Sequence, residues 1–162
     1  MGVEIRPAVP ADATGIRRVA RETWHATYDE IIGSEAVDTV VDEWYAIEGL
    51  EASMDRADGR FLVGVTGGDV VGFAQGVLDD PADLPRIYVA PDRWGEGLGS
   101  ALLDRIEGWL RAEGADRLRL SVAADNEIGN AFYEKRGYEI AEQRAIEVAG
   151  LEIEEYVRER EL

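Results

Sequence analysis

Residue types that often carry chemistry are scarce in this sequence. It contains no cysteine and a single histidine, His25, and Lys135 is its only lysine. Without cysteine, disulfides, thiolate metal sites and a cysteine nucleophile are excluded. We expect no bound metal.

Long apolar runs are absent as well. No stretch approaches the ~20 consecutive apolar residues that a membrane-spanning helix requires. The first residues read Met-Gly-Val-Glu-Ile-Arg and lack the basic and apolar blocks of a secretory signal peptide. We therefore expect a cytoplasmic protein that does not associate with membranes.

The length and the spread of apolar residues indicate one folded unit. The chain has 162 residues, of which 46% are hydrophobic, and these are distributed along the sequence. Domains cluster around 100 to 200 residues, so a second domain has little room. No internal repeat, low-complexity segment or linker interrupts the chain. We expect a single domain over residues 1–162.

Positive charge is scarce relative to negative charge. There are 17 basic and 34 acidic residues, which gives a formal net charge of −17. A basic face for nucleic acid is not visible, so we expect no nucleic-acid partner. Two origins of the acidity remain open. One is a halophilic protein in a high-salt cytoplasm, and the other is genomic drift from lysine to arginine with an acidic surface that recruits cations.

The halophilic interpretation makes a testable prediction about stability. The screening length grows from about 3 Å at 1 M salt to about 30 Å at 0.01 M, so repulsion among the carboxylates strengthens on dilution. We expect the melting temperature to fall as KCl is diluted from molar to millimolar concentration. Thermal unfolding across a KCl series measures this, and a melting temperature that is independent of salt contradicts the halophilic interpretation.

Hydrophobic periodicity predicts an α/β chain. Strands are expected at residues 3–8, 61–65, 70–78, 84–90, 118–122, 138–148 and 151–158. Helices are expected after Asp12, over 37–44, near 50–54, from Leu98 to a stop at Gly114, and over 126–136, with 31–34 as a loop and cap. Turns at 67–69 and 149–150 make two hairpins. The order predicts a mixed, mostly antiparallel sheet of about seven strands, with helices on both faces (α+β).

A glycine-rich turn carries the strongest chemical signal. Residues 94–100 read Trp-Gly-Glu-Gly-Leu-Gly-Ser and stand between a strand and a helix start. Such a turn presents several backbone amides to one point and adds the favourable dipole of a helix N-terminus, which suits a pyrophosphate. Neither the dinucleotide fingerprint nor a P-loop fits this spacing. An ordinary glycine-rich turn is the alternative for this segment taken alone.

Two blocks together resemble the GCN5-related N-acetyltransferase (GNAT) family. Residues 84–99 are similar to its fourth strand, its Val-x-Pro exit and its Arg/Gln-x-x-Gly-x-Gly/Ala signature, with Trp94 in the place of Arg or Gln. Residues 126–138 resemble its Asn-x-x-Ala-x-x-x-Tyr block and closing glycine, with Gly129 in the place of alanine. The resemblance implies an acyl-CoA N-acyltransferase fold, acetyl-CoA as acetyl donor and an amine acceptor. Many members of the family form dimers, so a homodimer is an open expectation here.

The resemblance also implies roles for individual residues. The cofactor-binding residues it implies are Ile87, Tyr88, Val89, Trp94, Gly95, Glu96, Gly97, Leu98, Gly99, Ser100 and Asn126. The amides of the turn would hold the pyrophosphate, and Ile87 and Val89 would pair with pantetheine like an added strand. The fourth and fifth strands would separate at a bulge and open a slot between Val89 and Val122. Asn126 also fits a plain helix N-cap.

Tyr133 is the candidate catalytic acid under this resemblance. A phenol with a pKa near 10 can protonate the departing CoA thiolate, although packing beside Phe132 is the alternative role. For the base, strand 84–90 offers Arg86 and Tyr88 but no carboxylate. Candidates remain in the segment that we expect as a loop after the first helix: Glu22, His25 and Asp29. A water chain to bulk solvent is an equal alternative.

The acceptor is open at this point. A polyamine, an aminoglycoside-like compound or a protein N-terminus would each supply a primary amine. Trp24 and Tyr28 could line the acceptor pocket or belong to the core. Two other classes of function compete with the enzyme. One is a CoA-binding sensor that has lost turnover, which Trp94, Gly129 and the missing carboxylate of the fourth strand would suit. The other is an acidic interaction protein, which leaves both glycine blocks unexplained.

Overall fold

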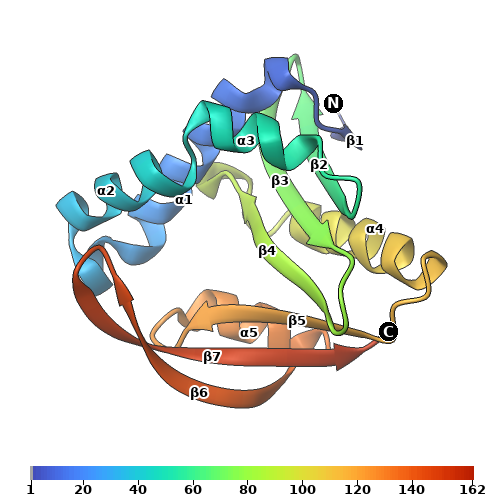
Figure 1. Ribbon diagram of the computed structural model, residues 1–162. Helices are drawn as coiled ribbons and strands as arrows, with labels where there is room; N and C mark the ends of the chain where they lie inside the picture. Colours follow the sequence, from blue (N-terminus) through green and yellow to red (C-terminus); the bar gives the residue numbers. More distant parts are fainter. Residues whose placement is uncertain (1) are drawn as a thin grey trace.

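Seven strands form one mixed sheet in the computed structural model, which describes residues 2–162 (Figure 1). The sheet order is β1-β2-β3-β4-β5-β7-β6, and every neighbouring pair is antiparallel except β4 and β5. The strands are β1 (Glu4–Pro7), β2 (Gly59–Thr66), β3 (Asp69–Val77), β4 (Ala82–Val89), β5 (Arg117–Ala123), β6 (Glu139–Val148) and β7 (Leu151–Glu161). This confirms the predicted acyl-CoA N-acyltransferase type of fold.

Helices cover both faces of the sheet, as Figure 1 shows. They are α1 (Ala13–Ile32), α2 (Ser34–Trp44), α3 (Ile47–Met54), α4 (Leu98–Ala112) and α5 (Glu127–Lys135). The core of α1, α2 and α3 includes the fully buried Ile16, Leu50 and Phe73. The core of α4 and α5 on the opposite side includes Leu102 and Ile106. Within residues 2–162, no helix is both long enough and apolar enough to cross a membrane.

Both predicted hairpins are confirmed. Gly67 and Gly68 turn β2 into β3 with φ of 57° and 83°. Ala149 and Gly150 turn β6 into β7, also with positive φ, which only glycine adopts without strain. Strand bounds lie close to the predicted ones, except that β7 continues three residues further, to Glu161.

The prediction of a loop over residues 31–34 was wrong. Helix α1 continues through Ile32, and Gly33 alone, with φ of 89°, separates it from α2. Ser34 is the first residue of α2 instead of its cap. The three base candidates Glu22, His25 and Asp29 therefore lie within α1 and not in a loop after it. The structure also resolves α2 and α3 as separate helices before β2.

The parallel strands β4 and β5 begin together and then separate (Figure 1). They pair only at Ala82 with Leu118 and at Asp83 with Arg119. The register between β3 and β4 shifts once. Gln75 of β3 pairs with Arg86 and Val77 pairs with Asp83, so β4 is the longer strand over this stretch. A bulge of this kind bends a strand and ends its pairing. The predicted separation of the fourth and fifth strands is thus present.

Candidate functional site

A cavity of about 620 Å³ occupies the space where β4 and β5 diverge. Its wall comes from α1, the end of β4, the glycine-rich turn, the start of α4, the end of β5 and α5. Val89 and Val122 lie on it, as the sequence predicted for the slot. The residues of the wall are Thr23, Thr27, Tyr28, Ile87, Tyr88, Val89, Arg93, Trp94, Gly95, Gly97, Leu98, Gly99, Ser100, Ser121, Val122, Asn126, Ile128, Gly129, Phe132, Tyr133, Lys135 and Arg136.

The end of β4 directs backbone groups that do not pair with β3 toward this cavity. Ala90 N–H donates to the Val71 carbonyl at 2.9 Å, so the hydrogen-bonded residues of β4 on this side are Ala90, Tyr88 and Arg86. Because hydrogen-bonded and non-bonded pairs alternate in antiparallel strands, Ile87 and Val89 direct their N–H and C=O groups away from β3. They face the gap toward β5, which is the geometry that an added extended chain needs.

The glycine-rich turn leads into α4 through two residues with positive φ. Gly95 has φ of 83° and Gly97 has φ of 87°, conformations that favour glycine. Gly97 is the N-cap of α4 and has no side chain to satisfy the first amides of the helix. Those amides and the helix dipole favour an anion at this point. Every predicted residue of the turn lies on the cavity wall except Glu96, which pairs with Arg93 at 3.6 Å.

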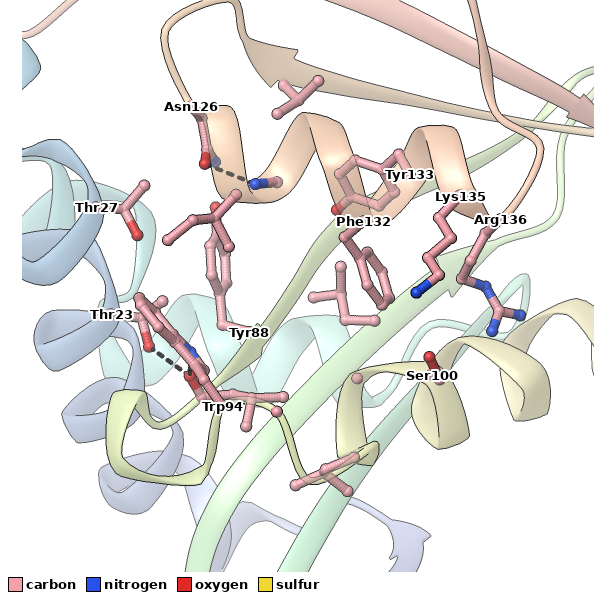
Figure 2. A pocket seen from close by; sticks show the side chains of 18 of the residues that line it. Thr23, Thr27, Tyr88, Trp94, Ser100, Asn126, Phe132, Tyr133, Lys135 and Arg136 are labelled. Atoms are coloured by element: carbon pink, nitrogen blue, oxygen red, sulfur yellow. Dashed lines mark hydrogen bonds between the residues drawn. The ribbon is translucent and has the colours of Figure 1, made fainter.

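Trp94 departs from the family signature and has a structural role that the sequence did not indicate. Its indole N–H donates to the Val89 carbonyl at 2.7 Å, and the Thr23 hydroxyl of α1 donates to the same carbonyl at 3.1 Å (Figure 2). The turn and α1 therefore meet at one edge carbonyl of β4. Trp94 holds the strand end in place. Its backbone N–H donates to the Pro91 carbonyl at 3.3 Å, whereas no hydrogen bond among residues 2–162 uses the amides from Gly95 to Ser100.

All the charged side chains on the cavity wall are cationic. They are Arg93, Lys135 and Arg136, in a chain with a net charge of −17. Figure 2 shows Lys135 and Arg136 reaching from the end of α5 toward Ser100 at the start of α4. Within residues 2–162, Lys135 forms no ion pair, while Arg136 pairs with Asp104 and Glu107. Sequence reasoning missed these three residues, although the single lysine beside an arginine was a usable signal.

Asn126 acts as the N-cap of α5, which confirms one of its two predicted roles. Its side-chain oxygen accepts a hydrogen bond from Gly129 N–H at 2.9 Å, and its amide nitrogen donates to the Tyr28 hydroxyl at 3.4 Å. A Cβ at position 129 would lie 2.6 Å from the Asn126 amide nitrogen. Glycine at this position thus leaves room for the cap, and Asn126 remains on the cavity wall.

Tyr133 lies on the cavity wall and is half-buried. Its ring packs edge-on against Phe132, with 5.3 Å between centroids, so the predicted packing contact exists (Figure 2). None of the hydrogen bonds found among residues 2–162 uses its hydroxyl. Burial first, and then the nearby Tyr28 and Tyr45, raise the pKa of Tyr133 above its ordinary value. The phenol is therefore neutral and able to donate at any physiological pH.

His25 lies outside the cavity wall. Its Nδ1 is 2.7 Å from Asp29 and its Nε2 is 2.9 Å from Asp38 of α2. The hydrogen bond with Asp29, followed by the contact with Asp38, raises the pKa of His25 and favours the imidazolium. A protonated ring held by two carboxylates links α1 to α2 and is poorly suited to accept a proton. Glu22 and Asp29 do not lie on the wall either.

The aromatic pair of α1 divides between the core and the cavity. Trp24 and Tyr28 stack with 4.3 Å between ring centroids, and both are buried. Tyr28 reaches the cavity wall, while Trp24 packs behind it against Trp44 and Tyr88. Burial is the main reason why the pKa of Tyr28 is raised to about 12.

The expectation that the fourth strand lacks a carboxylate was wrong. The strand begins at Ala82, two residues earlier than predicted, and therefore includes Asp83. Burial raises the pKa of this carboxyl. Asp83 is nevertheless absent from the cavity wall. Among residues 2–162, no group of three or more His, Cys, Asp or Glu side chains is placed to hold a metal ion.

Comparisons with known proteins identify relatives of this arrangement. The family model described as "Acetyltransferase (GNAT) family" matches residues 18–138. A spermidine N(1)-acetyltransferase of Thermoplasma acidophilum is 30% identical over 145 residues, which is 86% of this chain and 90% of the relative. The crystal structure of PaiA N-acetyltransferase from Thermoplasma acidophilum, in complex with coenzyme A, superposes with a TM-score of 0.88 at 26% identity and covers 100% of both chains. A GCN5-related N-acetyltransferase structure from Rhodopseudomonas palustris has a TM-score of 0.82 at 22% identity, covers 100% of this chain and 97% of the other, and supports the fold.

Proposed function

The chain belongs to the GNAT acetyltransferase family and transfers the acetyl group of acetyl-CoA to an amine, and on that premise we propose that its acceptor is a polyamine of the spermidine kind. The similarity to a spermidine N(1)-acetyltransferase over 86% of the chain carries this proposal. The net charge of −17 adds to it, because a strongly acidic protein attracts polycations over long range at low salt.

The proposed donor site runs along the cavity from α4 to the gap between β4 and β5. Turn amides at Gly95 to Ser100 bind the pyrophosphate, and Lys135 and Arg136 supply positive charge to the phosphate groups of CoA. Ile87 and Val89 pair with pantetheine through the backbone groups that face the gap. Support comes from the concentration of cations on the wall of a cavity in an otherwise acidic protein.

The proposed chemistry is a direct attack by the neutral amine. The amine nitrogen forms a bond to the thioester carbonyl carbon, and the Val89 N–H donates to the oxyanion that develops. The carbon–sulfur bond then breaks, and the Tyr133 hydroxyl gives its proton to the sulfur. Water removes the surplus proton of the amine and restores the Tyr133 phenol, which leaves N-acetylamine and CoA. Burial disfavours phenolate and thiolate alike, so the raised pKa of Tyr133 does not by itself prevent this transfer.

Two alternatives lose their support under this proposal. A CoA-binding sensor drew on Trp94, Gly129 and the missing carboxylate of the fourth strand. The indole holds β4, Gly129 accommodates the Asn126 cap, and the proposed chemistry uses water in place of a strand carboxylate to remove the proton of the amine. An acidic interaction protein does not account for a cavity with a cationic end. We treat residues 1–162 as one acetyltransferase domain, because strands from both ends of the chain enter the same sheet.

Acetylation of spermidine tests the proposal directly. With acetyl-CoA and spermidine, we expect saturable CoA thiol release and a singly acetylated spermidine in the mass spectrum. A peptide with a free N-terminal alanine serves as the comparison acceptor, and calorimetric titration of acetyl-CoA, with NADH as a control ligand, establishes donor binding. Acetylation of the peptide without acetylation of spermidine contradicts the polyamine acceptor.

A further inference from the structure

Three carboxylates are buried in the described part of the chain: Asp12, Glu107 and Glu155. The first two are fully committed to the fold. Asp12 accepts from both terminal nitrogens of Arg6 and from Val9 N–H. Glu107 accepts from Tyr138, Arg136 and Arg160. Their partners account for the burial of both groups.

Glu155 differs from the other two because it has a single partner. It is 7% exposed, and its Oε2 accepts from the Arg144 Nε at 2.7 Å. No residue among 2–162 donates a hydrogen bond to its Oε1. The Arg144 side chain is 45% exposed and stands on the edge strand β6. A buried carboxylate is therefore held by one half-exposed arginine that reaches it from the edge strand.

Glu155 is not itself on the cavity wall, but its partner Arg144 connects it to a residue that is. It is paired with Ala123 at the end of β5, so both side chains lie on the same face of the sheet. Arg144 also donates to the Ser121 hydroxyl at 3.4 Å, and Ser121 lies on the cavity wall. Ala124 N–H donates to the Glu154 carbonyl at 2.9 Å, which holds this part of β7 beside the segment that leads to Asn126 of the wall.

The cavity thus has a cationic end and, next to its other end, a buried carboxylate. The nine residues of α5 separate Asn126 from Arg136, and both of these residues lie on the cavity wall (Figure 2). An acceptor that enters near Tyr28 and Ser121 meets neutral hydroxyl and amide groups on the wall. Glu155 is connected to that part of the wall through Arg144, which bonds both to this carboxylate and to Ser121.

We propose that Glu155 binds an ammonium group of the acceptor, and that Arg144 occupies this carboxylate until the acceptor displaces it. The inference rests on the cationic acceptor proposed above. The reacting amine must be neutral when it attacks, so the ammonium bound by Glu155 is a second, non-reacting one. The substrate class is then an amine with a further positive charge along its chain, such as a diamine or polyamine, in preference to a monoamine.

Two substitutions separate this role from that of a structural ion pair. Glu155→Gln keeps the shape and removes the charge, and we expect it to raise the KM for spermidine about tenfold or more while the KM for acetyl-CoA stays unchanged. Arg144→Gln removes the competing cation, and we expect it to lower the KM for spermidine. If the pair were purely structural, both substitutions would change the KM for spermidine in the same direction.

The control comes from the same pair of strands. Glu159 pairs with Arg119 at 2.8 Å, across β7 and β5 on the same face as Glu155 and further from the cavity. Glu159→Gln should leave the KM for spermidine unchanged. Glu155→Gln should leave the KM for the monoamine propylamine unchanged. Thermal unfolding reports whether each variant is folded. If Glu155→Gln does not fold, Arg144→Gln still tests the proposal, because Arg144 is exposed.

The outcomes distinguish this inference from the proposed function. A wild-type protein that does not acetylate spermidine contradicts the polyamine acceptor and this inference with it. Wild-type activity on spermidine combined with an unchanged KM in Glu155→Gln, or with a raised KM in both variants, overturns the role of Glu155 and leaves the acceptor in place.

Discussion

Replacing Tyr133 with phenylalanine is expected to lower kcat by about 10² to 10⁴, the range of general acid catalysis. The substitution removes only the hydroxyl and keeps the ring that packs 5.3 Å from Phe132. Without the phenol, the thiolate leaves unprotonated into a cavity that disfavours charge. Binding of acetyl-CoA, measured by calorimetry, should stay near the wild-type value, because the turn and the edge of β4 are unaltered. Steady-state kinetics with the best acceptor measures kcat.

Tyr138→Phe is the matched control for this prediction. The Tyr138 ring lies 5.9 Å from that of Tyr133, but its hydroxyl bonds to Glu107 and is absent from the cavity wall. We expect this variant to lose stability while it retains kcat. If Tyr133→Phe keeps kcat within a few-fold of wild type and instead unfolds more easily, then Tyr133 serves packing alone.

The features that sequence predicted are those that local chemistry determines. Gly95 and Gly97 have positive φ, and the paired glycines of the β2–β3 turn do as well, so their positions in the sequence mark turns directly. The helical spacing of Leu98, Leu102 and Ile106 reflects a face that is buried in the structure. For these reasons the order of elements, the sheet and the glycine-rich turn at the start of α4 could all be predicted.

The failures concern features that depend on where distant segments meet. The extent of α1 was missed because Ile31 and Ile32 are compatible with a loop as well as with a helix, and only packing decides between them. His25 is held by Asp38, thirteen positions later in the sequence, through the pairing of α1 with α2. Asp83 joins β4 through its register with Arg119 of β5. No local pattern encodes these contacts.

Trp94 illustrates how a departure from a motif acquires meaning only in three dimensions. In the sequence it replaces an expected polar side chain and weakens the case for a phosphate contact. In the structure its indole N–H reaches back to Val89, and Thr23 from α1 reaches the same carbonyl. Of the three cations on the cavity wall, Arg93 beside the turn pairs with Glu96, and the other two, Lys135 and Arg136, come from the end of α5. Much of the positive charge of the site is thus supplied by another element.

Removal of the Glu107 side chain is expected to have the largest effect on stability, lowering the free energy of unfolding by about 3–5 kcal/mol. Glu107 is 2% exposed and accepts from Arg136, Arg160 and Tyr138, so Glu107→Ala removes the acceptor of the buried Tyr138 hydroxyl and of two partly buried guanidinium groups. Denaturant unfolding at fixed salt concentration measures the loss.

The control is Asp104→Ala, because Asp104 bonds to the same Arg136 but its side chain is 67% exposed, and a pair of that kind contributes about 1 kcal/mol or less. The cavity should respond as well, since Arg136 lies on its wall, and the KM for acetyl-CoA should rise in Glu107→Ala more than in Asp104→Ala. Equal losses of stability in the two variants would show that the buried carboxylate is no more important than the exposed one. Equal KM values for acetyl-CoA would show that the link from the core through Glu107 to the cationic end of the cavity does not exist.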